Sequence, residues 1–157
     1  MIQSIGLEWA EYIALHQGHL YPPEMHEEVD TFRALLSSSD LSMGNLSDGI
    51  LCSWAIFDGS QKPIYLYDLA VLPQFQGGGL ARDLMRRVFA ATRWLGLDVQ
   101  CHARFTSYPL LGSIPFLTEC GYRLYTDTFL PNHYGKEYES DTLVEDGHHL
   151  VFCPIGK

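Results

Sequence analysis

Three consecutive glycines, Gly77, Gly78 and Gly79, stand between an apolar segment and a stretch with the pattern of an amphipathic helix. The first turn of a helix leaves backbone N–H groups without intrahelical partners and carries partial positive charge, so it binds phosphate groups well. Glycines let the backbone approach phosphate oxygens where a Cβ atom would obstruct them. The sequence QFQGGGLARDL therefore predicts a pyrophosphate-binding turn at the start of a helix.

Two other phosphate-binding patterns do not fit this turn. The P-loop pattern requires Lys followed by Ser or Thr, and neither follows the glycines. The dinucleotide pattern G-x-G-x-x-G begins at Gly77 and Gly79 but has Arg82 where its third glycine belongs. A connection that binds nothing is the remaining alternative. Each glycine costs roughly 0.5 to 1 kcal/mol relative to alanine, so a mere connection would not need three.

The residues around the glycines resemble a family motif. Five of them follow the pattern V-x-P-x-x-Q-x-x-G-x-A, namely Val71, Pro73, Gln76, Gly79 and Ala81. This pattern is similar to the acyl-CoA signature of the GNAT family of N-acetyltransferases. Upstream, YLYDLAVLP resembles the family's fourth strand, and downstream GSIPFLTECGY resembles its later helix ending in a Gly-aromatic pair. The resemblance covers about residues 64–122.

The resemblance implies acetyl-CoA as acyl donor, a primary amine of a small molecule or peptide as acceptor, and no metal ion. The backbone at the end of the apolar strand would bind the pantetheine arm and the thioester carbonyl, and the amides of the glycine turn would bind the pyrophosphate. The expected cofactor-binding residues are Leu69, Ala70, Val71, Gln76, Gly77, Gly78, Gly79, Leu80, Ala81, Arg82 and Ser113. Arg82 either adds a charge contact or is a solvated helix arginine, and Tyr108 could also line the site.

Acetyl transfer needs a neutral nitrogen, whereas a free alkylamine has a pKa of about 10, so a base or a desolvating channel must remove its proton. The resemblance places Tyr67, Asp68 and His102 near this step. Tyr67 would orient a water or act as the acid. Asp68 and His102 are each a base or a hydrogen-bonded structural residue. The position of the tyrosine that protonates the thiolate in many members holds Leu117.

Two further hypotheses stay open beside the enzyme. Leu117 at the usual acid position suits a non-catalytic acyl-CoA-binding regulatory module. A glycine-rich protein-interaction domain without a cofactor is the other hypothesis. Turnover of an amine would exclude the module, and stabilisation by CoA would exclude the interaction domain.

The composition limits the partners. Ten Lys and Arg against nineteen Asp and Glu give a formal net charge of −9 over 157 residues, which disfavours nucleic acid and favours a cationic acceptor. No apolar run is long enough to span a membrane, and the N-terminal residues do not resemble a secretion signal, so we expect a cytoplasmic protein. Exposed sheet edges in this fold often pair, which leaves a homodimer open.

Other polar and aromatic groups have plainer interpretations. The acidic groups at residues 24–30 and 137–141 are interpreted as solvated surface. The four cysteines lie far apart in apolar contexts, which favours reduced core thiols over disulfides or metal ligands. His148 and His149, at the start of the last strand, are interpreted as structural. The aromatic segments HLYPPEM and FLPNHYGKEY could rim an acceptor channel.

The elements that must position these residues follow from periodicity and turn chemistry. Helices are expected over about residues 8–17, from near Pro23 to the serines at 37–39, over 80–95, and briefly in SIPFLTECGY. The Asp48-Gly49 pair predicts a hairpin, and strands are expected at LDVQCHARF, RLYTDTFL and HHLVFCP. These elements make one α+β (mixed α/β) domain over residues 1–157. The resemblance implies a central, twisted, mostly antiparallel sheet of about six or seven strands flanked by about four helices.

The segment IYLYDLAV, residues 64–71, is β-branched, aromatic or aliphatic over nearly its whole length, which predicts a central strand buried on both faces. Regular alternation would place Tyr67 and Leu69 on one face of this strand and Asp68 on the other. We therefore expect only one of Tyr67 and Asp68 to face the thioester.

Overall fold

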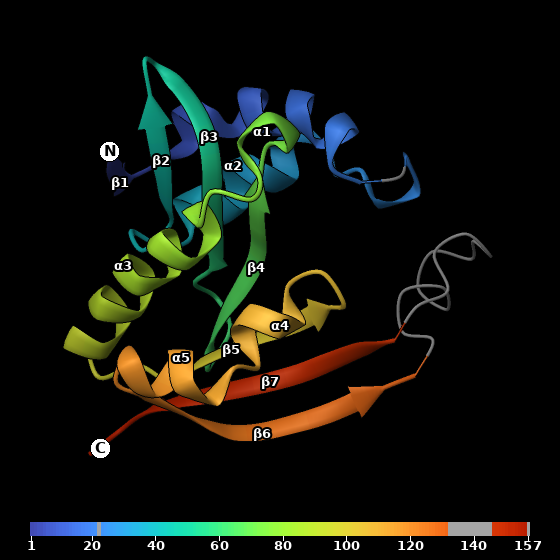
Figure 1. Ribbon diagram of the computed structural model, residues 1–157. Coiled ribbons are helices and arrows are strands. Elements are labelled where there is room, and N and C mark those ends of the chain that lie inside the picture. The colour runs from blue at the N-terminus through green and yellow to red at the C-terminus, as the bar shows by residue number, and fades with distance from the viewer. Residues whose placement is uncertain (22, 132–145, 157) are drawn as a thin grey trace.

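The computed structural model describes residues 1–21, 23–131 and 146–156, and a seven-stranded sheet runs through them (Figure 1). The strands are β1 (Ile2–Ser4), β2 (Met43–Ser47), β3 (Ile50–Asp58), β4 (Ile64–Val71), β5 (Val99–Arg104), β6 (Tyr122–Leu130) and β7 (Gly147–Pro154). Their order in the sheet is β1-β2-β3-β4-β5-β7-β6. The pair β4 and β5 is parallel and all other neighbours are antiparallel, which confirms the predicted mixed fold class.

Helices cover both faces of the sheet. They are α1 (Ala10–His16), α2 (Val29–Ser37), α3 (Leu80–Trp94), α4 (Tyr108–Leu111) and α5 (Ile114–Glu119), with 3-10 turns at Leu7–Trp9, Gln17–His19, Pro23–Met25 and Pro73–Phe75. Helices α1 and α2 pack on one face, and α3, α4 and α5 pack on the other (Figure 1). No helix in the described ranges is long and apolar enough to cross a membrane.

Each face has its own hydrophobic core. On the α1 and α2 side, Trp54 and Ile56 of β3 pack with Ile13 and Phe32. On the other side, apolar residues of α3, α5, β5 and β7 surround Phe89, whose ring lies 4.8 Å from that of Tyr122. Every fully buried large side chain contributes roughly 1.5 to 3 kcal/mol, so the two cores account for most of the driving force.

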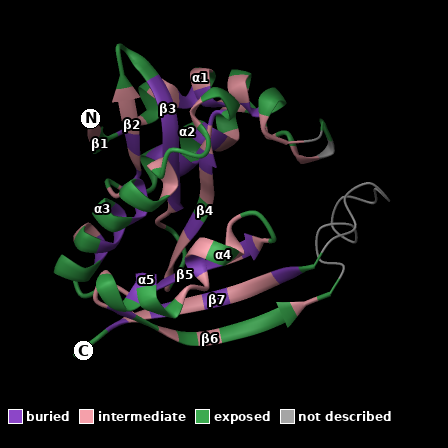
Figure 2. Cartoon of the chain, in the orientation of Figure 1, coloured by how far each residue is buried: buried purple, intermediate pink, exposed green. Residues whose placement is uncertain are grey.

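The strand buried on both faces is β3, not β4 as the sequence predicted. Residues 51–57 of β3 are all buried, whereas only Leu66 and Ala70 of β4 are (Figure 2). The apolar residues of β4 are partly exposed because this strand borders two cavities. In this chain, a strand that borders a cavity is therefore about as rich in apolar and aromatic residues as a strand inside the core.

A β-bulge at Tyr67 changes the alternation along β4. Asp68 pairs with Ile56 and Leu66 pairs with Phe57, so two consecutive residues of β3 oppose three of β4, and Tyr67 is the extra residue. A bulge of this kind redirects the side chains that follow it. The prediction that Tyr67 and Asp68 face opposite sides was therefore wrong, because it assumed an uninterrupted strand.

The pairing of β4 with β5 is short. It extends over Ile64 to Leu66 on β4, opposite Val99 to Cys101 on β5. Beyond Leu66 the ladder with β5 ends, so the β5-facing edge of β4 from Tyr67 to Val71 is not covered by a neighbouring strand. This open edge, in the middle of the sheet, borders the candidate site.

The helix ends largely follow the sequence signals. Helix α3 begins after Gly79 and closes before Gly96, and both glycines have positive φ angles, 81° and 69°. Leu84 and Val88 of α3 are buried, whereas Leu95, just after its last residue, is 57% exposed. The second predicted helix begins at Val29 and not near Pro23, because Pro23–Met25 forms a separate 3-10 turn. The sequence did not predict β1 or α4.

Tyr122 connects β6 to the end of α3. Its buried hydroxyl donates to the Leu97 carbonyl at 2.8 Å and lies 2.8 Å from Thr92 Oγ1. Burial raises the pKa of Tyr122 to about 12. We expect Tyr122→Phe to lower the free energy of unfolding by about 1 to 3 kcal/mol in urea titrations, since the buried carbonyl loses its donor. Tyr125→Phe, at a 61% exposed position of the same strand, should change it by less than about 0.5 kcal/mol.

Tyr122 should also make the stability of the fold depend on pH in the alkaline range. The folded pKa of Tyr122 lies above the unfolded value of about 10, so its contribution is fully present below pH 10 and is lost as the pH rises toward about 12. Wild type should therefore lose more stability than Tyr122→Phe between these pH values. An equal loss in both proteins would contradict the assignment.

Candidate functional site

The glycine turn presents the start of α3 to open space. Gly77 and Gly79 have φ angles of 86° and 81°, and a Cβ atom built on either would meet nothing within 4 Å. No side chain caps the helix, and the first intrahelical bond joins Asp83 N to Gly79 O at 3.0 Å. The amides of the first helical turn, which precede Asp83, therefore have no intrahelical acceptors and can receive an anion.

A cavity of about 490 Å³ extends from this turn along β4. Nine of the predicted cofactor-binding residues line it, namely Leu69, Ala70, Val71, Gln76, Gly77, Gly79, Leu80, Ala81 and Arg82. Gln76 Nε2 donates to the Val71 carbonyl at 2.9 Å, which ties the turn to the end of β4. The Arg82 guanidinium lies 4.8 Å from the centroid of the Phe116 ring.

Two predicted cofactor residues have other positions. Gly78 and Ser113 are not among the residues that line this cavity. Ser113 is the N-cap of α5, where its hydroxyl accepts from Phe116 N at 3.4 Å. Their contact with a cofactor stays a prediction.

A second cavity, of about 390 Å³, adjoins the first and brings the predicted catalytic residues together. Tyr67, Asp68 and His102 all line it. Five residues line both cavities: Tyr21, Leu69, Arg104, Thr106 and Ser107. The two cavities therefore meet beside Leu69, on the open edge of β4. We call the first the turn cavity and the second the tyrosine cavity.

His102 is paired with Tyr65, which the sequence analysis did not single out. The Tyr65 hydroxyl lies 2.6 Å from His102 Nδ1, and the His102 ring stacks on His149 with centroids 4.8 Å apart. His149 Nε2 in turn lies 2.9 Å from Gln100 Oε1. The imidazole is thus held in place by a hydroxyl and an aromatic stack, which fixes the orientation a proton-transfer group needs.

Asp68 serves a structural network as well as lining the tyrosine cavity. Its carboxylate accepts from the Tyr21 hydroxyl at 2.6 Å and from Trp54 Nε1 at 3.0 Å. Burial raises the pKa of Asp68, while these two donors and the charge of Arg104 act in the opposite direction. The network joins β4 to the segment after α1, so the hydrogen-bonded structural interpretation of Asp68 has direct support.

Tyr67 faces a carboxylate from the segment before α2. Its hydroxyl donates to Glu27 Oε1 at 2.7 Å, and both side chains line the tyrosine cavity. Glu27 belongs to the acidic group interpreted from the sequence as solvated surface. For this residue the interpretation was wrong, because the chain folds back across β4.

The residues around the helix motif have structural roles. Leu117 is fully buried in the core beside α3, so the position of the usual acid faces away from both cavities. Tyr108 donates a short hydrogen bond to Asp127, which is the main cause that raises its pKa. His148 also binds Asp127, with Nδ1 2.7 Å from Oδ1. Most of the predicted rim segment FLPNHYGKEY, residues 132–138, lies outside the described residues.

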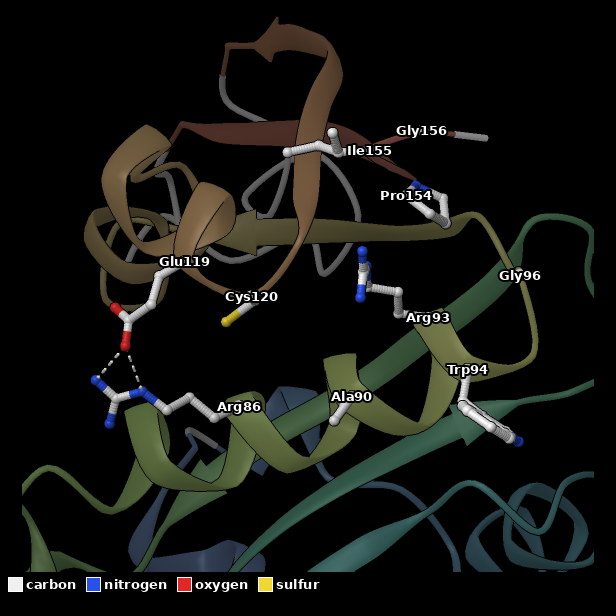
Figure 3. A pocket seen from close by; sticks show the side chains of 10 residues that line it. All are labelled: Arg86, Ala90, Arg93, Trp94, Gly96, Glu119, Cys120, Pro154, Ile155 and Gly156. Atoms are coloured by element: carbon white, nitrogen blue, oxygen red, sulfur yellow. Dashed lines mark hydrogen bonds and ion pairs between the residues drawn. The ribbon is translucent and has the colours of Figure 1, made fainter.

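A larger cavity, of about 630 Å³, lies between α3 and the end of β7 (Figure 3). Arg86 of α3 and Glu119 of α5 form an ion pair at 3.0 Å on its wall, and the Cys120 thiol and Arg93 face its interior. Burial raises the pKa of Cys120, which disfavours the reactive thiolate. None of the predicted site residues lines this cavity, so size alone does not identify the site.

The additional residues of the tyrosine cavity lack a local sequence signal. Tyr65 and His102 are 37 residues apart, and Tyr67 and Glu27 are 40 residues apart. Only the tertiary fold brings them together. In the described ranges, no three His, Cys, Asp or Glu side chains are grouped so that they could hold a metal ion.

Comparisons with known proteins agree with this geometry. A search of curated protein sequences finds no match. Among solved structures, the ribosomal-protein-S18-alanine N-acetyltransferase from Escherichia coli superposes with a TM-score of 0.71 at 18% identity, covering 100% of this chain and 94% of that chain. Arabidopsis thaliana Naa50 in complex with a bisubstrate analogue gives 0.67 at 11% identity, covering 96% of each chain. The GphF GNAT-like decarboxylase in complex with isobutyryl-CoA gives 0.71 at 14%, covering 98% of each.

At these identities the solved structures establish a shared fold. The family comparison goes further, because the sequence model described as the acetyltransferase (GNAT) family matches residues 9–122. That range contains the glycine turn, α3 and every residue that lines the turn cavity or the tyrosine cavity. The chain therefore belongs to the GNAT acetyltransferase family, the class of acetyl-CoA-dependent N-acetyltransferases.

Proposed function

We propose that residues 1–157 form one domain that transfers an acetyl group from acetyl-CoA directly to a primary amine of a small molecule or peptide. The observation that carries this proposal is the junction of the two cavities beside Leu69. One cavity leads to a phosphate-binding helix start, and the other holds polar side chains suited to an amine. A cytoplasmic location and a homodimer stay predictions from the sequence.

The residues of the turn cavity fit acetyl-CoA, which would supply the acetyl thioester. The free amides at the start of α3 and the space above Gly77 and Gly79 suit a pyrophosphate. The β5-facing edge of β4, beyond the last residue paired with β5, would hydrogen-bond the pantetheine amides as an added strand does. A backbone donor on this edge near Leu69 would polarise the thioester carbonyl.

Deprotonation of the amine is assigned to His102, with Tyr65 as its positioning partner. An imidazole with an ordinary pKa of about 6.5 accepts a proton near neutral pH far more readily than a phenol. The Tyr65 hydroxyl, 2.6 Å from Nδ1, orients the His102 ring, and His102 lines the tyrosine cavity. Asp68, with two donors already bound, holds the surrounding segment in place. Tyr67 remains a candidate to orient the amine or a water.

Direct transfer is favoured over an acyl-enzyme. Cys101 lines the tyrosine cavity, but burial raises the pKa of its thiol to about 12, so almost no thiolate is present at neutral pH. Ser107, at the junction, donates its hydroxyl to the Arg104 carbonyl at 3.3 Å. Among the residues that the structure describes, no hydrogen bond joins either side chain to the base that an activated nucleophile requires.

A non-catalytic acyl-CoA-binding module is the second candidate. It is favoured by Leu117, which puts a core side chain where many relatives have an acid. The GphF decarboxylase shows that this fold also occurs in a protein whose named activity is not acetyl transfer. If the protein is an enzyme, solvent must protonate the CoA thiolate that leaves. A thiol with a pKa near 8.5 needs only modest help from an acid to do so.

The test is incubation with acetyl-CoA and a panel of amines, with detection of free thiol. Acetylated product with any amine supports the enzyme, and no turnover with tight acetyl-CoA binding supports the module. CoA at a hundred times its dissociation constant should stabilise the fold by about 2.7 kcal/mol in either case. The absence of any stabilisation would reject both.

Gly79→Glu should abolish acetyl-CoA binding, measured by calorimetry, because it adds a carboxylate and bulk where the pyrophosphate would bind. Gly96→Glu is the matched control, since Gly96 also has a positive φ angle, 69°, and open space, but lies at the other end of α3. Both variants carry a backbone strain of about 1 to 2 kcal/mol. Equal affinity of the two variants would show that the turn is not the phosphate site.

His102→Gln should lower kcat/KM for the amine by roughly 10² to 10⁴, the usual contribution of a general base, with little change in the affinity for acetyl-CoA. His148→Gln is the control, because His148 is bound to Asp127 and lines neither cavity. A similar loss in both variants, or none in His102→Gln, would contradict the role assigned to His102.

Initial-rate kinetics should give intersecting lines when both substrate concentrations are varied, since direct transfer needs both in the cavities together. Cys101→Ala should keep this pattern and should retain turnover. Parallel lines, or a labelled acetyl group on the enzyme, would instead indicate a covalent intermediate.

A further inference from the structure

The segment between α1 and α2 is held by a side-chain amide. Gln17 is 7% exposed, one of only a few buried polar residues described. Its Oε1 accepts from Glu27 N at 2.8 Å, and its Nε2 donates to the Glu27 carbonyl at 2.7 Å. An amide side chain offers one acceptor and two donors, so it can bind both backbone groups of one residue. Gln17 thus bonds both backbone groups of Glu27, as a residue of a neighbouring β-strand would, and fixes the position of Glu27.

The Glu27 carboxylate is left without a cation. It accepts from the Tyr67 hydroxyl at 2.7 Å and lines the tyrosine cavity. Within the part of the chain that the structure describes, no Lys, Arg or His pairs with it. Acidic residues of α1 and α2 behave differently, since Glu11 and Asp30 both pair with Arg33 at 2.9 and 2.8 Å. A carboxylate has room for about four donors, so Glu27 retains free acceptor positions toward the cavity.

The other charged groups of the tyrosine cavity already have partners. Asp68 accepts from two side chains and lies close enough to Arg104 for the charge to lower its pKa. His102 is held by Tyr65. Glu27 is therefore the carboxylate in this cavity that remains available for a bound cation.

The cation that Glu27 binds should not be the nitrogen that is acetylated. A neighbouring carboxylate stabilises an ammonium group and raises its pKa, which opposes the deprotonation that attack requires. Glu27 is also displaced from the junction of the cavities, because it lines the tyrosine cavity alone, whereas Leu69 lines both. A group bound to Glu27 would therefore lie away from the junction beside Leu69.

We propose that Glu27 is a specificity-determining residue that binds a second positive charge of the acceptor, not the nitrogen that is acetylated. The acceptor is thus a small diamine or another primary amine with a second cationic group, a size suited to a cavity of about 390 Å³. Gln17 is the positioning residue for Glu27. This inference rests on the proposed acetyl transfer, but the binding of a diamine to Glu27 can be measured without it.

The experiment compares wild type, Glu27→Gln and Glu28→Gln. Glu28 is the neighbouring exposed acid, it lines neither cavity, and its side chain makes no capping bond, so it is a matched charge control. Each protein is titrated calorimetrically with 1,4-diaminobutane and with butylamine, and the KM of each amine is measured where turnover occurs. A lysine dipeptide and its norleucine counterpart form a second pair, which separates a peptide from a small diamine as source of the charge.

Wild type and Glu28→Gln should favour the dicationic member of a pair by at least about tenfold, as expected for a hydrogen bond to a charged group. Glu27→Gln should lose most of that preference. If the preference depends on Glu27 but no amine is acetylated, the acetyl-transfer proposal fails and this inference stands. Equal binding of both members by wild type, or an unchanged preference in Glu27→Gln, overturns the inference.

Gln17→Met tests the positioning role, because methionine fills similar space without either hydrogen bond. It should raise KM for the diamine by about the same factor as Glu27→Gln, with KM for acetyl-CoA unchanged. The double variant should be no worse than either single one, since the two residues act as a unit. A variant that only lowers the melting temperature, with the preference for the diamine intact, would show that Gln17 is merely structural.

Discussion

The open edge of β4 is the constraint on which the rest of the site depends. A strand in the middle of a sheet normally pairs on both sides, yet β4 pairs with β5 only from Ile64 to Leu66. Backbone donors and acceptors beyond that point need water or a ligand, because an unpaired buried group costs about 1 to 3 kcal/mol. In the proposed function, the extended acyl donor, with its amide groups, takes the place of the missing strand along this edge. The same opening lies where the two cavities meet, beside Leu69.

The bulge at Tyr67 adapts β4 to this opening. Without it, Tyr67 and Asp68 would point to opposite faces, and only one would reach the tyrosine cavity. With it, both line that cavity. Tyr67 binds Glu27 while Asp68 binds Tyr21, so two hydrogen bonds join β4 to the segment between α1 and α2. A single inserted residue thus connects the strand that would hold the donor to the segment that borders the acceptor.

The features that could be predicted from the sequence are those set by residues close together in the chain. The glycine turn and the start of α3 depend on residues within about ten positions, and nine of the predicted cofactor residues line one cavity. The fold class was equally accessible, because strand and helix periods are local. The bulge at Tyr67 could not be predicted from the sequence, since it depends on the register between β4 and β3. The contacts of Tyr65 with His102 and of Glu27 with Tyr67 could not be predicted either, because no short-range pattern indicates which distant side chains will meet.

The distribution of charge explains how a chain with a net charge of −9 can accept an anionic donor. Electrostatic interactions are screened over about 8 to 10 Å at physiological ionic strength, so local groups outweigh the total. The turn cavity has the start of α3 and Arg82, whereas the tyrosine cavity has Glu27 and Asp68. Arg104 lies at their junction, over the Tyr21 ring at 5.7 Å. The charged groups that line the two cavities therefore differ in sign. In the proposed function, this difference directs the polyanionic donor to the turn cavity and a cationic acceptor to the tyrosine cavity.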